Sequence, residues 1–215
     1  MRITKYTHSC LRIDGDGAGD GVLVVDPGEF SERSALDGAD AVLITHEHID
    51  HLDLAALAET VTRRPGLRVF AHADVLPKLA AFGDIATAVA PGQAFDAAGF
   101  RVRAYGGRHA LIHPDIPRIA NLGYLIADDG ANVYHPGDSF TVPEDTVVDT
   151  LFVPLNAPWM KLMESIDFVR AVKPGRAFAL HDALLNETGA KLSDGHLTRL
   201  SGTTYAHVAP ETKIS

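Results

Sequence analysis

The sequence predicts a protein of two β-sheets covered by helices, and three observations support this fold class. Short runs of aliphatic and β-branched residues recur along the chain, bounded by Gly, Pro or Asp. Between some of them lie segments with helical periodicity, such as residues 54–64, which carry apolar side chains at 54, 57, 58 and 61. His and Asp residues follow several of the predicted strands. The sequence therefore predicts layered β-sheets with a functional site formed by His and Asp side chains at the ends of the strands.

The predicted elements can be justified in order from these patterns. The expected strands are residues 2–6, 10–14, 21–25, 41–44, 67–71, 85–89, 93–96, 100–105, 122–127, 132–134, 150–153, 176–180 and 203–208. The expected helices are residues 54–64, 74–82, 163–172 and 190–200. Asp53 is a suitable N-cap for the first helix, and Pro-Gly pairs end the first and third. The segment DGDGAGDG, residues 14–21, predicts a hairpin tip.

Length and composition predict one soluble domain spanning residues 1–215. No apolar run approaches the roughly 20 residues that cross a bilayer, and the N-terminus lacks the apolar segment of a signal peptide. The single cysteine, Cys10, excludes an internal disulfide and agrees with a reducing cytoplasm. The net charge of −9 argues against nonspecific nucleic-acid binding, which uses basic surfaces. The sequence does not predict the oligomeric state.

The most informative stretch is AVLITHEHIDH, residues 41–51. Four apolar residues, typical of a strand buried on both faces, precede His46, His48, Asp50 and His51. In an extended segment alternate side chains share a face, so His46 and His48 can bind one ion together. Asp50 and His51 follow the turn and can reach a neighbouring ion. Imidazole and carboxylate groups are suitable ligands for zinc and similar divalent metals, so the stretch predicts a metal site.

The motif THEHIDH resembles the signature of the metallo-β-lactamase superfamily of metal-dependent hydrolases. Further ligands of that family have counterparts in the expected order: His109 in GGRHA, Asp138 in HPGDS and His181 in FALHD. The resemblance runs from Tyr6 to His181 and implies the family's αββα sandwich, in which two mixed β-sheets are flanked by helices. Its diiron relatives commonly have Glu where His48 stands, so the resemblance favours a hydrolase over a redox centre.

Carried over residue by residue, the resemblance implies a site with two metal ions. His46, His48 and His109 would bind one ion, Asp50, His51 and His181 the other, and Asp138 would bridge them. A hydroxide shared by the two ions would attack the substrate, and Asp50 would orient it or relay a proton. Zinc suits these ligands best, and Mn²⁺, Fe²⁺ and Ni²⁺ bind the same groups.

A narrower resemblance connects the opening, YTHSCLRID followed by LVVDPG, with the small hydrolases that include ascorbate-phosphate lactonase. It implies that His8 approaches the site and that Asp26 lies behind the metals, although each also suits an ordinary turn. Residues 108–118 form a long loop in which His113 and Arg118 either face an anionic substrate or point to solvent. Trp159 either flanks the site entrance or packs its own loop.

These observations predict a dinuclear metal-dependent hydrolase that acts on a small ester, lactone or phosphodiester, with an anionic group as one possibility. The alternatives are a nuclease, which the acidic charge opposes, and a noncatalytic module that uses metal for stability and binds a partner. A structural zinc ion has a closed coordination sphere of four protein ligands, whereas seven ligand-type residues are present here.

Overall fold

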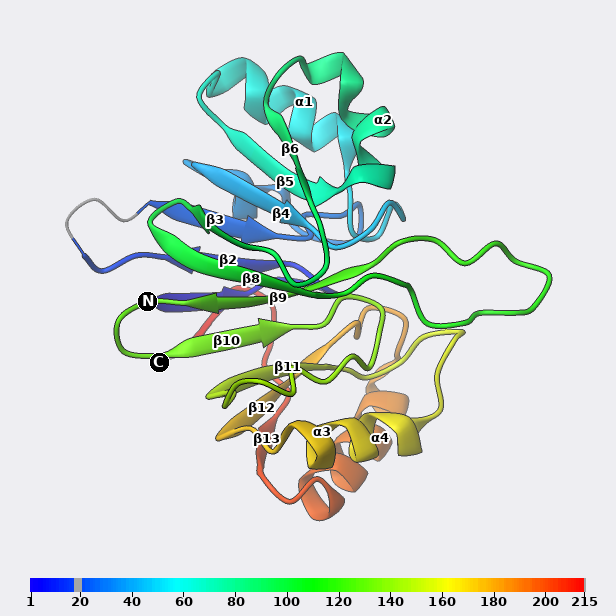
Figure 1. Cartoon of the computed structure of the whole chain (residues 1–215). Helices are drawn as coiled ribbons and strands as arrows, with labels where there is room; N and C mark the ends of the chain where they lie inside the picture. Colours follow the sequence, from blue (N-terminus) through cyan, green and yellow to red (C-terminus); the bar gives the residue numbers. More distant parts are fainter. Residues whose placement is uncertain (18–20, 215) are drawn as a thin grey trace.

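The computed structural model describes residues 1–17 and 21–214, which form two facing β-sheets with helices on their outer faces (Figure 1). Helices α1 and α2 cover the first sheet, and α3 and α4 cover the second (Figure 1). The predicted αββα sandwich of two mixed sheets is therefore confirmed.

The first sheet has the strand order β14-β1-β2-β3-β4-β5-β6. Its strands are β1 (Arg2–Lys5), β2 (Leu11–Asp14), β3 (Val22–Val25), β4 (Ala41–Ile44), β5 (Arg68–His72), β6 (Ala86–Val89) and β14 (Thr212–Ile214). Strands β14, β1, β2 and β3 pair antiparallel, whereas β3 to β6 pair parallel. The parallel half carries the most deeply buried strand, β4.

The second sheet has the order β13-β12-β11-β10-β9-β8-β7 and repeats this division. Its strands are β7 (Ala94–Ala97), β8 (Phe100–Gly106), β9 (Leu122–Ala127), β10 (Asn132–His135), β11 (Thr150–Pro154), β12 (Arg176–Leu180) and β13 (Thr204–Ala206). Strands β7 to β10 pair antiparallel and β10 to β13 parallel.

Four helices and three short 3₁₀ turns complete the described fold. They are α1 (Leu54–Arg63), α2 (Leu76–Leu79), α3 (Leu162–Val172) and α4 (Glu187–Leu200), with 3₁₀ turns η1 (Arg33–Leu36), η2 (Ala73–Val75) and η3 (Ala80–Phe82). Asp53 caps α1 by accepting a hydrogen bond from the Ala56 amide, as predicted. No helix in the described part of the chain has the length and apolar character to cross a membrane.

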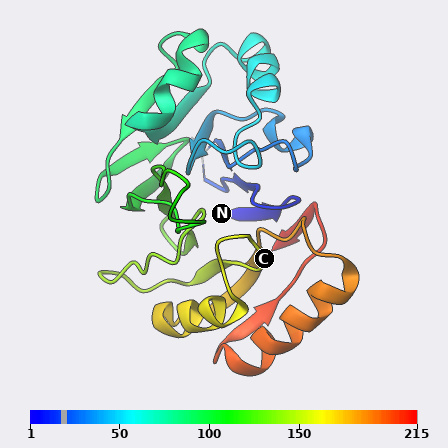
Figure 2. The same cartoon turned by 90° about the vertical axis from the view of Figure 1, so that its right-hand side faces the viewer.

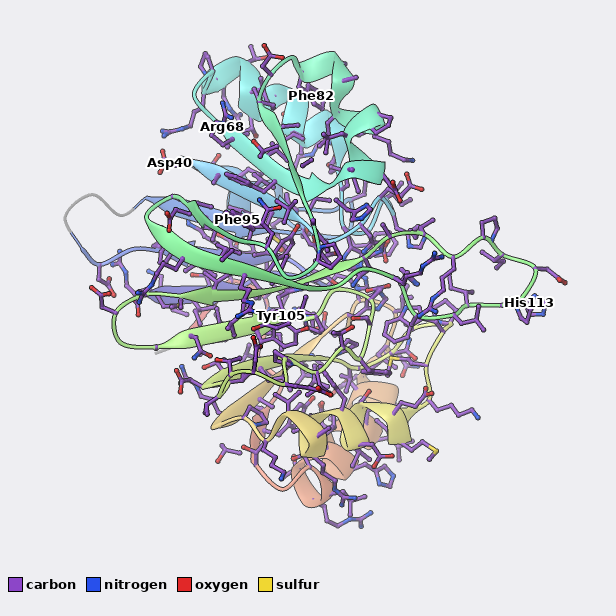
Figure 3. All side chains as sticks on the ribbon, in the orientation of Figure 1. Asp40, Arg68, Phe82, Phe95, Tyr105 and His113 are labelled. Atoms are coloured by element: carbon purple, nitrogen blue, oxygen red, sulfur yellow. The ribbon has the colours of Figure 1, made fainter. Side chains whose placement is uncertain are left out.

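Three buried layers hold the sandwich together. Between the sheets, large side chains such as Tyr124 and Phe152 fill the central layer. Phe70 of β5 stacks on Phe95 of β7 with ring centroids 4.9 Å apart, which joins the two sheets directly. Phe95 is labelled in Figure 3. The other two layers lie between each sheet and its helices. This closed core leaves the strand ends as the place for a site.

Three local expectations need correction or limitation. The segment expected as one helix over residues 74–82 is a succession of η2, α2 and η3, with Pro77 in its first turns. Residues 203–208 were expected to close the fold, but only Thr204–Ala206 is a strand, and β14 follows it. β14 has three residues with a single buried apolar side chain, too short for a periodicity signal. The expected hairpin tip falls partly on residues 18–20, which lie outside the described residues.

The topology gathers the expected ligands at one end of the sandwich. β8, β10 and β12 run in the same direction, and the chain leaves their carboxyl ends toward His109, Asp138 and His181. His46 lies two residues after β4 of the other sheet. Figure 2 views the molecule from this end, from which the loop between β8 and β9 protrudes.

Candidate metal centre

Eight side chains with metal-binding atoms meet at this end in two groups. One group contains His46, His48, His109 and Asp138, and the other contains His8, Asp50, His51 and His181. Within each group the ligand-type atoms all lie within 4.8 Å of one another. All seven residues expected as ligands are therefore brought together, and His8 lies with them.

The end of β4 presents His46 through a hydrogen-bond chain. The Thr45 hydroxyl donates to Asp26 Oδ2 at 2.6 Å, so its oxygen accepts from His46 Nδ1 at 2.9 Å. Asp26 Oδ2 also accepts from His51 Nδ1 at 2.6 Å, and its Oδ1 accepts from the Thr45 amide at 2.8 Å. Asp26 is fully buried behind the two histidines, in the position that the sequence resemblance implied. It leaves the Nε2 atoms of both rings directed into the site.

Two other histidines are oriented in the same way by backbone carbonyls. His109 Nδ1 donates to the Ala110 carbonyl at 2.6 Å, and His181 Nδ1 donates to the Asn156 carbonyl at 2.7 Å. A neutral imidazole that donates from Nδ1 carries a lone pair on Nε2. Such second contacts are the usual companions of metal-binding histidines, because they set the tautomer and the ring orientation.

The buried atoms that face the centre lack hydrogen-bond partners. Nε2 of His51, His109 and His181 and Oδ1 of Asp138 are in this condition. These nitrogens lie 3.1–3.2 Å from Asp138 oxygens, and between a neutral ring and a carboxylate lone pair would face lone pair. Burial lowers the pKa of His51 and His181, but Asp138 outweighs it and raises the pKa of His51 well above its ordinary value and that of His181 to about 9. Buried unsatisfied groups are costly, and a divalent cation between them would satisfy all of them at once. The residues present therefore fit a bound metal.

The electrostatics of the centre agree with this chemistry. Burial lowers the pKa of His46 well below its ordinary value, which keeps the ring neutral as a ligand requires. Burial alone would raise the pKa of the Asp50 carboxyl, but His181 and His8 outweigh it and hold that pKa well below its ordinary value. Asp50 is therefore a carboxylate at neutral pH, with its side chain 18% exposed toward the cleft.

His8 is bonded in the opposite sense from His46, His51, His109 and His181. The Ala183 amide donates to its Nδ1 at 3.3 Å, so the ring proton resides on Nε2. Nε2 then donates to Asp50 Oδ2 at 3.1 Å. The His8 carbonyl accepts from the His181 amide at 3.1 Å, which ties the first loop of the chain to the last ligand. His8 thus approaches the site as a hydrogen-bond donor to Asp50.

Close backbone approach requires glycine at two positions around the centre, and three further residues there have left-handed backbone conformations. A Cβ on Gly28 would overlap the backbone of Asp50, and one on Gly137 (φ 60°) would overlap Asn121 and Thr45. Three other residues of the centre have φ between 47° and 62°: His8, Asp26 and His181. Such conformations are costly for residues other than glycine and gather at functional sites.

A cleft of about 240 Å³ opens over the two groups. Besides ligand-type residues it is lined by Phe30, Ile112, Pro158, Trp159 and Leu184. Trp159 lies in the cleft wall, as one of the two readings of the sequence proposed, and its Nε1 donates to Asp138 Oδ2 at 2.9 Å. The opening therefore combines a polar floor with apolar walls.

The two charged residues expected to receive substrate lie elsewhere. His113 is at the tip of the protruding loop, with its side chain 60% exposed near Asp115 (Figure 3). Arg118 lines a small hollow of about 10 Å³ beside His48, where its Nε donates to the His109 carbonyl. Neither residue lines the 240 Å³ cleft.

Several residues of the site carry no signal in the sequence. Thr45 contributes a hydroxyl oxygen that accepts a hydrogen bond from a histidine ring. Asn156 contributes only its backbone carbonyl, which also accepts from a histidine ring. The cleft walls come from four separate loops, so no spacing rule connects Phe30 with Leu184. Thr45 directly precedes His46, and this position next to an expected ligand is the one signal that could have indicated it.

Comparison with known proteins agrees with the fold and identifies the family. Residues 2–181 match the model of the beta-lactamase superfamily domain. Protein Rv0786c from Mycobacterium tuberculosis is 37% identical over 218 residues, which cover all of both chains. A UPF0173 metal-dependent hydrolase, Ta0764 from Thermoplasma acidophilum, is 25% identical over 190 residues, covering 84% of this chain and 83% of the relative.

A solved structure shares the architecture at low identity. Igni18, a metallo hydrolase from Ignicoccus hospitalis, superposes with a TM-score of 0.75 and 18% identity, covering 99% of this chain and 97% of the other. At this identity the superposition supports the fold alone.

Proposed function

The chain belongs to the beta-lactamase superfamily and is a metal-dependent hydrolase, and on that premise we propose that it uses two divalent ions to hydrolyse a small ester, lactone or phosphodiester. His46, His48 and His109 would hold one ion, and Asp50, His51 and His181 the other. Zinc suits the donor set best, while Mn²⁺, Fe²⁺ and Ni²⁺ accept the same groups.

The position of Asp138 between the two groups carries the proposal. Its Oδ2 lies 3.2 Å from His109 Nε2 of one group and 3.2 Å from His181 Nε2 of the other. Its Oδ1 lies 3.1 Å from His51 Nε2. A carboxylate with lone pairs on both sides is suited to bridge two cations, which a single closed structural ion would not need.

The ions, when bound, would lower the pKa of water to about 7 and polarise the substrate oxygen. The chain supplies the geometry. Asp50 reaches the cleft as a carboxylate, held by His8, where it can orient the attacking water and accept its proton. Trp159 holds one oxygen of Asp138 and excludes water from that side of the floor. No serine or cysteine nucleophile is required.

Depletion and reloading of metal tests this function. Chelator-treated protein should lose turnover on an aryl ester, a γ-lactone or bis(4-nitrophenyl) phosphate, and added Zn²⁺ or Mn²⁺ should restore it. Equal turnover before and after depletion would contradict a metal-dependent reaction at this site. A noncatalytic module would bind the metal and gain stability but hydrolyse none of the three classes under any metal.

A further inference from the structure

The walls of the cleft differ in character from its floor. Polar groups at the floor belong to the ligand set, whereas the walls are aromatic or aliphatic. The five wall residues come from four separate loops. Phe30 follows β3, Ile112 lies between β8 and β9, Pro158 and Trp159 follow β11, and Leu184 follows β12. Four loops therefore converge on the centre and present apolar side chains.

Two of the wall residues are exposed to solvent. Leu184 is 53% exposed and Phe30 is 40% exposed, although both lie beside the most polar part of the molecule. The neighbouring loop adds Leu111 at 53% and Ile116 at 46%. Large apolar side chains that surround a pocket and remain in contact with water indicate a surface that a ligand covers.

No lysine or arginine side chain among the described residues lines the cleft to receive an anion. Arg118 lies in the adjoining small hollow, and its Nε is engaged with the His109 carbonyl. Trp159 Nε1 is already bonded to Asp138. The net charge of −9 also disfavours the approach of an anion.

From this arrangement we infer that the substrate is an uncharged carboxylic ester or lactone whose nonreacting part is a short apolar chain or ring. This inference rests on the proposed function, because it assumes that the metals receive the reacting carbonyl. The cleft volume is about 240 Å³, so the apolar group that its walls can cover is small. The metals bind the reacting group, and the walls select the remainder.

Hydrolysis of a matched ester series tests the inference. The series contains 4-nitrophenyl acetate, butyrate and hexanoate, together with the charged 4-nitrophenyl hemisuccinate, which resembles the butyrate in length. The metal-loaded protein should show kcat/KM rising about fourfold for each methylene that the walls cover. The hemisuccinate should be a poorer substrate than the butyrate. A hemisuccinate preferred over the butyrate would overturn the inference and favour Arg118 as the substrate-reading residue.

A matched pair of variants locates the effect. Leu184→Asp places a charge in the cleft wall and should remove the preference for hexanoate over acetate. Leu192→Asp introduces the same change on an α4 residue that is 65% exposed and outside the cleft, so the preference should persist. Metal content is measured for both. A preference unchanged in Leu184→Asp would overturn the role of the walls.

A binding measurement separates this inference from the proposed reaction. Acetohydroxamate and hexanohydroxamate share one metal-binding head and differ only in the alkyl chain. Calorimetry should give at least tenfold tighter binding of the longer compound to the wild type and no such difference in Leu184→Asp. Equal affinities together with ester turnover would overturn the inference and leave the hydrolase proposal standing. Tighter binding of the longer compound without turnover of any ester would show that the walls bind an apolar group but would contradict an ester as the substrate and the proposed reaction.

Discussion

His8 Nε2 lies 3.1 Å from Asp50 Oδ2, and the Ala183 amide fixes the His8 tautomer that makes this contact a hydrogen bond. Four other buried histidines donate from Nδ1 and keep Nε2 for the centre. His8 therefore fixes the orientation of a carboxylate in the site. Its location in the first loop couples the N-terminal segment to Asp50, which lies 42 positions later.

Replacement of His8 should weaken the site without unfolding the protein. His8→Phe fills the space but cannot donate to Asp50. The affinity for the ion that Asp50 would bind and the kcat should therefore each fall about 10–100-fold. His8→Gln places an amide N–H near the former Nε2 and should recover most of the loss. Chelator competition gives the metal affinity and steady-state kinetics the turnover. Equal defects in the two variants would show that the hydrogen bond has no such role.

Metal loading should give two ions per chain. Seven expected ligands, of which Asp138 is the central carboxylate, exceed what one tetrahedral ion can use. Elemental analysis after saturation and desalting measures the ratio. A ratio that never exceeds one under excess metal would refute the dinuclear centre.

His48→Ala should reduce the ratio toward one and lower turnover at least about 100-fold. The fold should persist, because His48 is only partly buried and belongs to none of the three apolar layers. His196→Ala, on α4 away from the centre, is the control and should retain both metal and turnover. Normal turnover in His48→Ala would contradict its assignment as a ligand.

Asp26→Asn should lower metal affinity while preserving the loop. Asparagine tolerates the left-handed backbone at this position, where φ is 47°. Its amide nitrogen cannot accept the proton of His51 Nδ1, so His51 loses its orientation. Metal affinity should fall about 10–100-fold, measured by chelator competition. Asp37→Asn, an exposed carboxylate in another loop, serves as the control and should bind metal as the wild type does.

Stability should depend on pH through His207. The ring donates to Asp182 and Asp194 at 3.0–3.2 Å, and the contact with Asp182, followed by that with Asp194, raises its pKa above the ordinary value despite partial burial. A raised folded-state pKa stabilises the protein fully below the unfolded pKa of about 6.5, and the contribution disappears as pH rises through the folded value.

The His207→Gln variant checks this dependence. Its free energy of unfolding should lie about 1–2 kcal/mol below that of the wild type at pH 6, and the gap should narrow by pH 9. Denaturant titrations at both pH values measure it, with His196→Gln as control. A gap that is constant or widens with pH would exclude a charged His207 as its source.

The centre was predictable from sequence because its ligands follow strands. His46, His48, Asp50 and His51 are nearly contiguous after a fully buried strand, and His181 directly follows β12. Strand direction then determines where such residues meet. The substrate-facing residues were not predictable in this way, because the direction of a loop side chain depends on its neighbours. His113 and Arg118 share one loop, yet neither lines the cleft, whereas Ile112 of the same loop does.

In the fold, too, the elements with a local sequence pattern were predictable, whereas those that depend on contacts with distant parts of the chain were not. Strands such as Leu122–Ala127 and Arg176–Leu180 agree with their apolar patterns to the residue. β14 is stabilised by its pairing with β1 at the other end of the chain, so its three residues carry little local signal. The hydrogen bond from the His181 amide to the His8 carbonyl is likewise a product of the tertiary structure.

Trp159 is the single tryptophan of the chain, and its indole nitrogen bonds to the carboxylate that lies between the two ligand groups. All native indole fluorescence therefore originates at the wall of the cleft. Occupation of the centre would place positive charge beside Asp138 and thus change the electric field at the excited ring, whereas events at the far side of the sandwich would leave the emission unchanged. The protein thus contains its own optical probe, so the rate of metal entry can be followed by stopped-flow emission without an attached dye.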